Sequence, residues 1–273
     1  MPFGILNNIP ALQAEDALDN TQMSLNTTLQ QLSTGQRINS GADDPAGLAI
    51  ANGLSANIAA LNQSVQNAND GVGNLQVADG ALSQVTSLLN TAVTIATEAS
   101  TGTVSSSQRD SLDAEYQQIL QEINRIGTTT EYNGTSVFSA ATTSIYLTDA
   151  NANSTITSTV GALSDTTLAL NGTQLAGVDG TNAQAALTAI DAAVQTVAND
   201  RGTIGASVNR LQDASAVMST EVQNLTAAEN NIMAADIPSA ISQLSNLSVL
   251  SQTGMAALAQ ANSQQQSILK LLQ

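Results

Sequence analysis

The stretch RINSGADDPAGLAIANGL, residues 37–54, separates two segments that both have the hydrophobic spacing of a helix. Asp43 or Asp44 can accept hydrogen bonds from the free amides at a helix start. Pro45 suits the first helical position, where the N–H that proline lacks would have no partner anyway. The stretch therefore predicts a turn followed by a new helix that begins near Pro45.

The segment after this turn repeats apolar residues at alternating intervals of four and three. The spacing predicts one helix with a single apolar seam, roughly 60 Å long at about 1.5 Å per residue. Three glycines should each weaken it by about 1 kcal/mol relative to alanine, so neighbouring helices must support it. The seam residues are Leu54, Ile58, Leu61, Val65, Ala68, Val72, Leu75, Leu82, Leu89, Val93 and Ala96, and the glycines are Gly71, Gly73 and Gly80.

Two further segments continue this pattern. One is predicted to begin at Ser107, with Asp110 three residues later as a capping-box variant, and to end at Gly127. The other keeps a heptad register from residue 187 to residue 232. Three such seams bury one another most simply in an antiparallel bundle of long helices.

Residues 128–180 have a different composition, rich in Thr, Ser, Asn and Gly. The runs TSIYLT and STITSTV have β propensity and lie on either side of the turn-forming stretch DANAN. This pattern predicts a β-hairpin with irregular turns, and we expect it to cap one end of the bundle.

The two chain ends are also amphipathic, rich in Gln, Ser and Asn and almost free of basic residues. Each therefore needs a partner helix rather than a membrane surface, and alone each should be only marginally ordered. The predicted fold is mainly α: a long antiparallel helical bundle or coiled coil with a small β-hairpin region and with the N- and C-terminal helices paired. The apolar residues of the ends are Leu18, Leu25, Leu29, Leu32, Ile237, Ile241, Leu244, Leu247, Leu250, Met255, Leu258, Ile268, Leu269 and Leu272.

Composition excludes several classes of function. The 273 residues include no His and no Cys, which removes imidazole bases, thiol nucleophiles and nearly all transition-metal sites, so no enzyme, metal or cofactor is expected. Six basic and 22 acidic residues give a net charge of −16, which disfavours nucleic acid and anionic membranes as partners. The N-terminal stretch has neither the basic start nor the apolar run of a cleaved signal peptide.

One stretch imitates a metal site. DANANSTITSTV, residues 149–160, begins like a calcium loop, but Ser154 and Val160 occupy the positions where an EF-hand needs Gly and a bidentate acid. A solvated hairpin turn is the better interpretation. The neighbouring acids Asp43 and Asp44 likewise favour helix capping over paired-carboxylate catalysis, because sequential side chains rarely face each other.

Several motifs, in order along the chain, resemble bacterial flagellin. They are LQQLSTGQRINSGADDPAGLAIANGLSANI (29–58), NANDGVGNLQVADGAL (67–82), GTTTEYNGTSVF (127–138), RGTIGASVNRL (201–211), NLTAAENNI (224–232) and ALAQANSQQQSILKLL (257–272). The resemblance implies a structural subunit that self-assembles into a helical homopolymer, the extracellular flagellar filament used for motility. The alternative is the related hook–filament junction protein, whose ends are similar.

The resemblance also implies a division of labour along the chain. Residues 1–43 with 235–273 would form the inner filament core, and residues 44–234 an outer helical domain with the hairpin region at 128–180. Other implied partners are a flagellar export chaperone and the cap and junction proteins, with export by the flagellar type III route. Core contacts would involve Leu18, Leu25, Leu29, Leu32, Ile241, Leu244, Leu247, Leu258 and Ile268, and the inner–outer join Arg37, Asn39, Asp43, Asp44 and Pro45.

A last implied partner is Toll-like receptor 5, which recognises many flagellins. In recognised relatives the contacting patch resembles Leu-Gln-Arg-Val-Arg-Glu-Leu-Ala, whereas residues 89–96 here read LNTAVTIA, without either arginine or the acid. The degraded patch would comprise Asn90, Thr91, Ile95 and Glu115. Because a central Arg often dominates such contacts, weak or absent receptor activation is expected.

Overall fold

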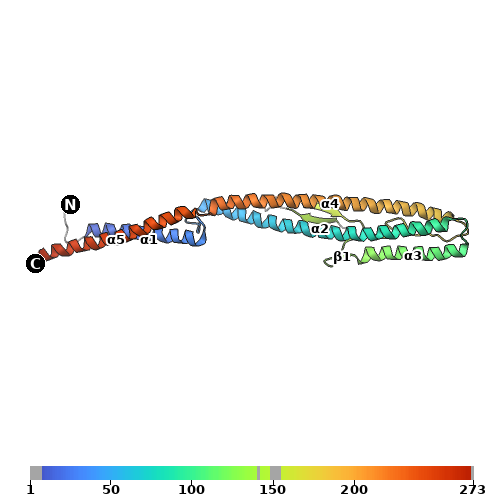
Figure 1. The fold of residues 1–273 in the computed structure, drawn as a ribbon, viewed down its shortest axis with the longest axis horizontal. Coiled ribbons are helices and arrows are strands. Elements are labelled where there is room, and N and C mark those ends of the chain that lie inside the picture. The colour runs from blue at the N-terminus through green and yellow to red at the C-terminus, as the bar shows by residue number, and fades with distance from the viewer. Residues whose placement is uncertain (1–7, 140–141, 148–154, 272–273) are drawn as a thin grey trace. The chain divides into compact units, whose positions relative to one another are not determined.

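The computed structural model describes residues 8–139, 142–147 and 155–271. The chain divides into two compact units, one formed by residues 1–56 with 224–273 and the other by residues 57–223. Two long helices, α2 (Pro45–Ser100) and α4 (Thr181–Met233), contribute to both units (Figure 1). Of the stretch at residues 149–160, which we interpret as a solvated hairpin turn, residues 149–154 lie outside the described residues.

In the first unit, the terminal helices α1 (Ile9–Thr34) and α5 (Ile237–Leu271) pack as an antiparallel pair. Asn8 caps α1, because its Oδ1 accepts from the amide of Ala11, while its Nδ2 donates to the Ala261 carbonyl (3.2 Å) of α5. Gly254 of α5 lets the two helices approach, since a Cβ there would lie 3.3 Å from Cδ1 of Leu18. The predicted pairing of the chain ends is confirmed.

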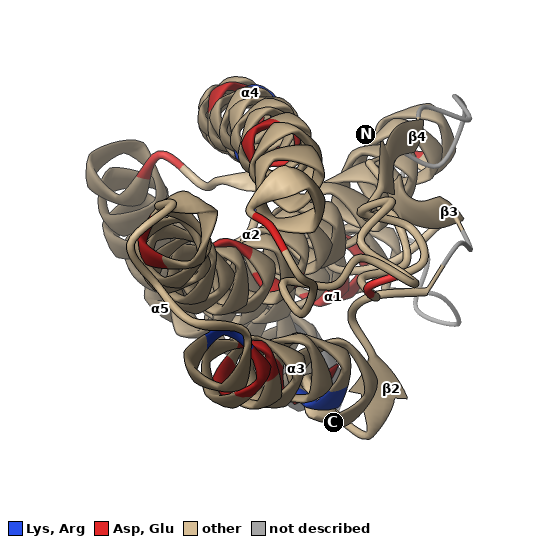
Figure 2. Cartoon of the chain, turned by 90° about the vertical axis from the view of Figure 1, so that its right-hand side faces the viewer, with Lys and Arg blue, Asp and Glu red and all other residues tan. Residues whose placement is uncertain are grey.

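In the second unit, α2 lies between α4 and α3 (Ser106–Thr129), as both views of the chain show (Figures 1 and 2). An ion pair between Arg201 of α4 and Asp79 of α2 (2.7 Å) joins two of these helices. The predicted helical bundle is confirmed. Its fully buried side chains include Leu82, Val85 and Leu89 from α2, Tyr116 and Ile123 from α3, and Ile190, Val197 and Leu211 from α4.

Both predicted ends of α3 need correction. Ser105, not Ser107, caps the helix: its Oγ accepts from the amide of Gln108, whose Oε1 accepts from the Ser105 amide (2.9 Å). The helix also continues past Gly127 to Thr129. Gly127 is needed for close packing instead, because a Cβ there would overlap the carbonyl oxygen of Leu163.

The predicted β-hairpin is present as β3 (Thr142–Tyr146) paired with β4 (Thr155–Thr159). It does not cap an end of the bundle, so that expectation is wrong. Ile145 instead lies over Gly71 of α2, where a Cβ would overlap its Cδ1 and lie 3.3 Å from Cδ1 of Leu211 in α4. The side chain of Asn67 also donates to the carbonyl of Tyr146 (3.3 Å). The hairpin therefore packs along the sides of α2 and α4, because its apolar face needs their surface.

Before this hairpin the chain forms a second, smaller one, β1 (Glu131–Tyr132) with β2 (Thr135–Ser136). Its turn residues Asn133 and Gly134 both have positive φ, which suits an Asn-Gly pair. After β4, the chain runs antiparallel to α3: the Asp165 amide donates to Asn124, and the Leu175 amide donates to Asp113 (2.6 Å). This segment covers the side of α3 and leads into α4.

Arg109 ties this returning segment to the connection between α2 and α3. The side chain is only 3% exposed, and no carboxylate in the described chain lies within ion-pairing distance of it. Its guanidinium donates instead to the backbone carbonyls of Ala99 (2.9 Å), Thr101 (3.4 Å), Val178 (3.2 Å) and Gly177 (3.5 Å). Hydrogen bonds to a charged group are stronger than neutral ones, so Arg109 stabilises this closure.

Candidate assembly surface and the turn before α2

The predicted inner–outer join is a hydrogen-bonded crossing of two chain segments. Gln36, just after α1, forms an antiparallel bridge with Ala234, just after α4. The Arg37 amide donates to the Met233 carbonyl (2.6 Å), and its guanidinium donates to the Ile232 carbonyl (2.9 Å). The end of α1 is therefore joined directly to the end of α4.

The two neighbouring acids of the turn have separate roles. Oδ2 of Asp43 accepts from the amides of Asn39 (3.0 Å) and Ser40 (2.8 Å), and these hydrogen bonds hold the pKa of its carboxyl below the usual range. Asp44 is the cap of α2, because its Oδ1 accepts from the amide of Gly47 (2.9 Å), and Pro45 is the first residue of the helix. Asp43 thus closes the turn and Asp44 starts the helix.

Two further residues of this turn were missed in the sequence. Ile38 is almost fully buried, and Gly47 of α2 receives it: a Cβ on Gly47 would overlap Oδ2 of Asp44 and lie 2.8 Å from Cδ1 of Ile38. An apolar residue isolated among polar ones, nine positions before a glycine, is too common a pattern to identify this contact. The fold brings them together.

The paired helices α1 and α5, which we call the terminal coil, have two sets of apolar residues. Half-buried residues form the seam between α1 and α5, at intervals of three and four. Of the predicted core contacts, Leu18, Leu25, Leu32, Leu244, Leu247 and Leu258 belong to this seam, Leu29 and Ile241 are exposed, and the side chain of Ile268 lies outside the described residues.

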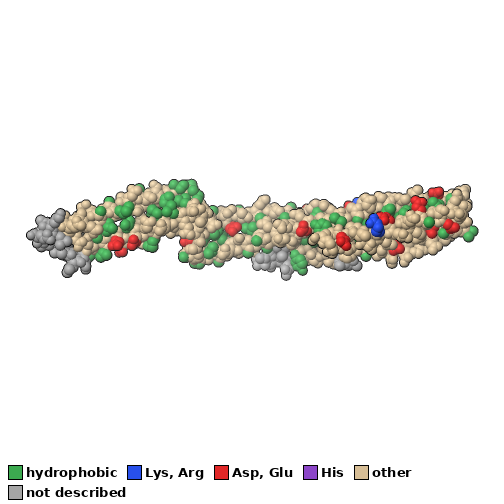
Figure 3. Space-filling model, turned by 90° about the horizontal axis from the view of Figure 1, so that it is seen from below, with side chains coloured by type: hydrophobic (Ala, Val, Ile, Leu, Met, Phe, Trp, Pro, Cys, Tyr) green, Lys and Arg blue, Asp and Glu red, His purple; other side chains and the backbone are tan. Residues whose placement is uncertain are grey.

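Among the described residues, the exposed large apolar side chains of α1 and α5 form what we call the outer apolar set. Hydrophobic side chains are prominent on the visible face of the part formed by α1 and α5 (Figure 3). Sequence reasoning included the α5 members except Val249 and missed most α1 members, because they fall outside the four-three repeat. The set comprises Ile9, Leu12, Met23 and Leu29 of α1 and Ile237, Ile241, Val249, Leu250 and Met255 of α5.

Charge is sparse around this set. Helix α5 contains no Asp or Glu and a single basic residue, Lys270, whereas α1 contains only Glu15, Asp16 and Asp19. The whole chain has 22 acidic and six basic residues, and Figure 2 marks them on the ribbon in red and blue. Depletion of charge around exposed apolar residues is typical of the core of a protein interface.

The residues of the predicted receptor patch fall in two environments. Asn90 and Thr91 of α2 and Glu115 of α3 are exposed, and the hydroxyl of Thr91 donates to the Ser87 carbonyl (3.1 Å) of its own helix. Ile95 is only 6% exposed, so it belongs to the packed side of α2. The exposed part of this patch is therefore uncharged on α2.

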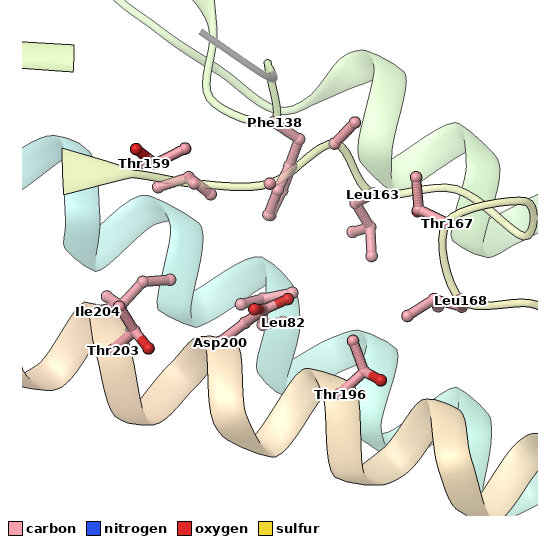
Figure 4. Close-up of a pocket in the computed structure, with 13 residues that line it drawn as sticks. Leu82, Phe138, Thr159, Leu163, Thr167, Leu168, Thr196, Asp200, Thr203 and Ile204 are labelled. Atoms are coloured by element: carbon pink, nitrogen blue, oxygen red, sulfur yellow. The ribbon is translucent and has the colours of Figure 1, made fainter. Parts of the chain in front are cut away.

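A cavity of about 50 Å³ lies beneath the segment that follows β4 (Figure 4). Leu82, Phe138, Leu163 and Ile204 supply apolar walls, and Asp200 of α4 lines one side, where partial burial raises the pKa of its carboxyl. Such a volume accommodates water rather than an organic ligand. Among the described residues, no group of three or more acids could hold a metal ion, and no helix is long and apolar enough to cross a membrane.

Comparison with known proteins agrees with this arrangement. The family model for the bacterial flagellin N-terminal helical region matches residues 5–143, and that for the C-terminal helical region matches residues 187–272. The crystal structure of Bacillus cereus flagellin is 30% identical, with a TM-score of 0.50, over 60% of this chain and 94% of that one.

Relatives of known role agree as well. Flagellin of Halalkalibacterium halodurans is 34% identical over 98% of this chain and 99% of its own length. The flagellar filament 30.7 kDa core protein of Treponema maltophilum is 30% identical over the same shares. Phase 2 flagellin of Salmonella typhimurium is 36% identical over 82% of this chain but 42% of its own. None of these matches favours the hook–filament junction protein, and the chain belongs to the bacterial flagellin family.

Proposed function

We propose that this chain is a structural subunit of the flagellar filament, and that its copies associate through the outer apolar set of α1 and α5. The observation that carries the proposal is that, among the described side chains of α1 and α5, nine large apolar ones stay exposed after the two helices pair. A second copy of the chain is the occupant that fits, because filament core proteins are among the relatives and the surface is nearly uncharged.

The free energy available from this surface is substantial. Fully burying one Leu or Ile side chain contributes about 1.5–3 kcal/mol. Leu250 and Ile241 are each about half exposed (55% and 54%), so covering either would contribute roughly 1 kcal/mol. Association also costs ordering entropy, so several such contacts must act together. The outer apolar set supplies enough of them on both terminal helices.

The turn before α2 suits the place where the chain leaves the inner core. We assign residues 1–43 with 235–273 to that core and residues 44–234 to the outer helical domain. The bridge at Gln36 and the cap at Asp44 support this assignment, because they end α1 and start α2 within a few residues. Arg37, Asn39 and Asp43 stabilise the turn between them.

The export route and further partners are proposed from the likeness to flagellins. As a flagellar filament component the protein is extracellular, and we propose that it is exported unfolded by the flagellar type III route with an export chaperone. The cap and junction proteins would contact its polymer ends. The absence of cysteine agrees with export as an unfolded chain, since no disulfide must form afterwards.

We also propose that Toll-like receptor 5 is activated weakly or not at all. The support is that Asn90 and Thr91 present no charge at the exposed surface of α2, where recognised relatives carry arginine. Exposed Glu115 of α3 cannot replace a guanidinium, because it offers acceptors in place of the donors of a planar fork.

The assembly proposal is tested by making the outer apolar set polar. In seeded elongation, the double variant Ile241→Ser/Leu250→Ser should raise the critical concentration roughly thirtyfold, from about 2 kcal/mol of lost burial per subunit. Val217→Ser is the matched control, because Val217 is an equally apolar and exposed residue (66%) of α4 in the other unit. Elongation of the double variant at the wild-type critical concentration would refute the proposal.

A further inference from the structure

The methionines of this chain differ sharply in their access to solvent. Of the five, Met23 of α1 is 61% exposed and Met255 of α5 is 53% exposed, whereas Met218 of α4 is only 6% exposed. Met233 is half-buried at the end of α4, and Met1 lies outside the described residues. Among the described methionines, the two accessible thioethers therefore both lie on the pair of helices formed by α1 and α5.

We propose that Met23 and Met255 are sites of reversible oxidation to the sulfoxide, and that this modification stops the subunit from joining a filament. The inference rests on the proposed role of the outer apolar set, to which both residues belong. It goes beyond that role by assigning the surface a chemical modification that controls it.

The oxidant is a peroxide such as hydrogen peroxide. A lone pair of the methionine sulfur attacks one peroxide oxygen, the O–O bond breaks as the S–O bond forms, and the departing hydroxide takes the remaining proton to become water. The sulfur loses two electrons and the peroxide gains them. Accessibility decides the rate for an uncharged thioether, so Met23 and Met255 should react well before Met218.

Methionine sulfoxide is polar, whereas the outer apolar set around it is apolar. A thioether is apolar and adaptable, which suits a contact that must repack against a second copy. A sulfoxide is polar, and burying it without a hydrogen-bond donor opposes association. No side chain of the outer apolar set is itself a hydrogen-bond donor, and Lys270 is the single basic residue of α5. Reduction by methionine sulfoxide reductases would restore the surface.

The test begins with the full-length monomer treated with hydrogen peroxide. Peptide mass spectrometry should show one added oxygen at Met23 and at Met255 while Met218 stays reduced. The helical circular dichroism signal should remain. Elongation of unoxidised seeds should then require about tenfold more subunit, which corresponds to about 1.4 kcal/mol. Treatment with both classes of sulfoxide reductase should restore elongation.

Two variants make the test specific. Peroxide should not change the elongation rate of Met23→Leu/Met255→Leu, whatever that rate is before treatment, because leucine cannot be oxidised. Met218→Leu is the control, and it should still lose elongation after peroxide.

The inference is overturned if wild-type subunit with verified sulfoxide at both positions elongates seeds normally. It is equally overturned if peroxide stops the double leucine variant as strongly as the wild type. A failure of unoxidised wild-type subunit to elongate would instead sink the proposed assembly surface, and with it this inference.

Discussion

Replacing Gly127 with alanine has opposite expected effects on stability from helix propensity and from the contact with Leu163. By helix propensity alone, the change should stabilise α3 by about 1 kcal/mol. In the structure, the new Cβ would overlap the carbonyl oxygen of Leu163 and lie 2.9 Å from its carbonyl carbon. Carbon atoms normally approach to about 3.5–4.0 Å, so the Leu163 backbone must move by roughly 1 Å.

The net effect follows from these two terms. Overpacking of this kind costs about 1–3 kcal/mol, and contact with backbone rather than a flexible side chain favours the upper half of that range. After subtracting the propensity gain, Gly127→Ala should destabilise the unit formed by residues 57–223 by about 1–2 kcal/mol. For a unit of this size the melting temperature falls by roughly 2–8 °C.

Gly80→Ala is the matched control, because Gly80 lies inside α2 of the same unit and a Cβ there would meet nothing within 4 Å. It should raise the melting temperature by roughly 2–4 °C, since only the propensity term remains. Both variants are measured by thermal denaturation of the monomer. If Gly127→Ala is stabilised as much as Gly80→Ala, the packing of Leu163 against α3 is refuted.

Four other outcomes are expected. Deleting residues 237–273 should leave a soluble helical monomer that does not polymerise, and filaments from that truncation would contradict the assembly surface. Because hydrogen bonds lower the pKa of Asp43, its contribution to stability is present above the usual carboxyl pKa and is lost as pH falls through the lowered pKa. Amide exchange in the turn at residues 37–45 should accelerate at that low pH, and Asp43→Asn should abolish this pH step. Thr91→Arg should increase signalling in a Toll-like receptor 5 reporter assay, where strong signalling by wild type would disprove the predicted loss. Amide exchange in the monomer should be faster over 1–35 and 240–273 than in the buried bundle, and uniform protection would show that the ends need no neighbours.

Local patterns were enough to predict the long helices and the break before α2. Four-three spacing identified α2 and α4, and the Asp-Asp-Pro sequence placed the start of α2 at Pro45. The β propensity of the runs on either side of DANAN identified β3 and β4. These features depend on interactions within a few residues, such as capping and side-chain period, so they are visible in the chain without its neighbours.

Placement of the hairpin could not be predicted in the same way. Its strands were identified, but Ile145 lies on Gly71, a residue that the sequence alone marked only as a weak point of α2. Gly127 similarly looked like a helix stop and is a packing position. In the sequence, a glycine that weakens or ends a helix looks the same as a glycine that allows close packing. Only the backbone or side chain that approaches the glycine in the structure distinguishes the two roles.

What the sequence by itself determined is therefore the helical register, the turn at residues 37–45 and the flagellin family motifs. What only the tertiary structure decided is how each register is used: which acid caps and which closes the turn, and which apolar residues of the ends are seam and which are exposed. Leu25 and Leu29 are equally apolar and one helical turn apart, yet Leu25 is half-buried in the seam and Leu29 is exposed. Periodicity defines an apolar stripe wider than one partner helix can cover, and the position of that partner selects the part that stays exposed.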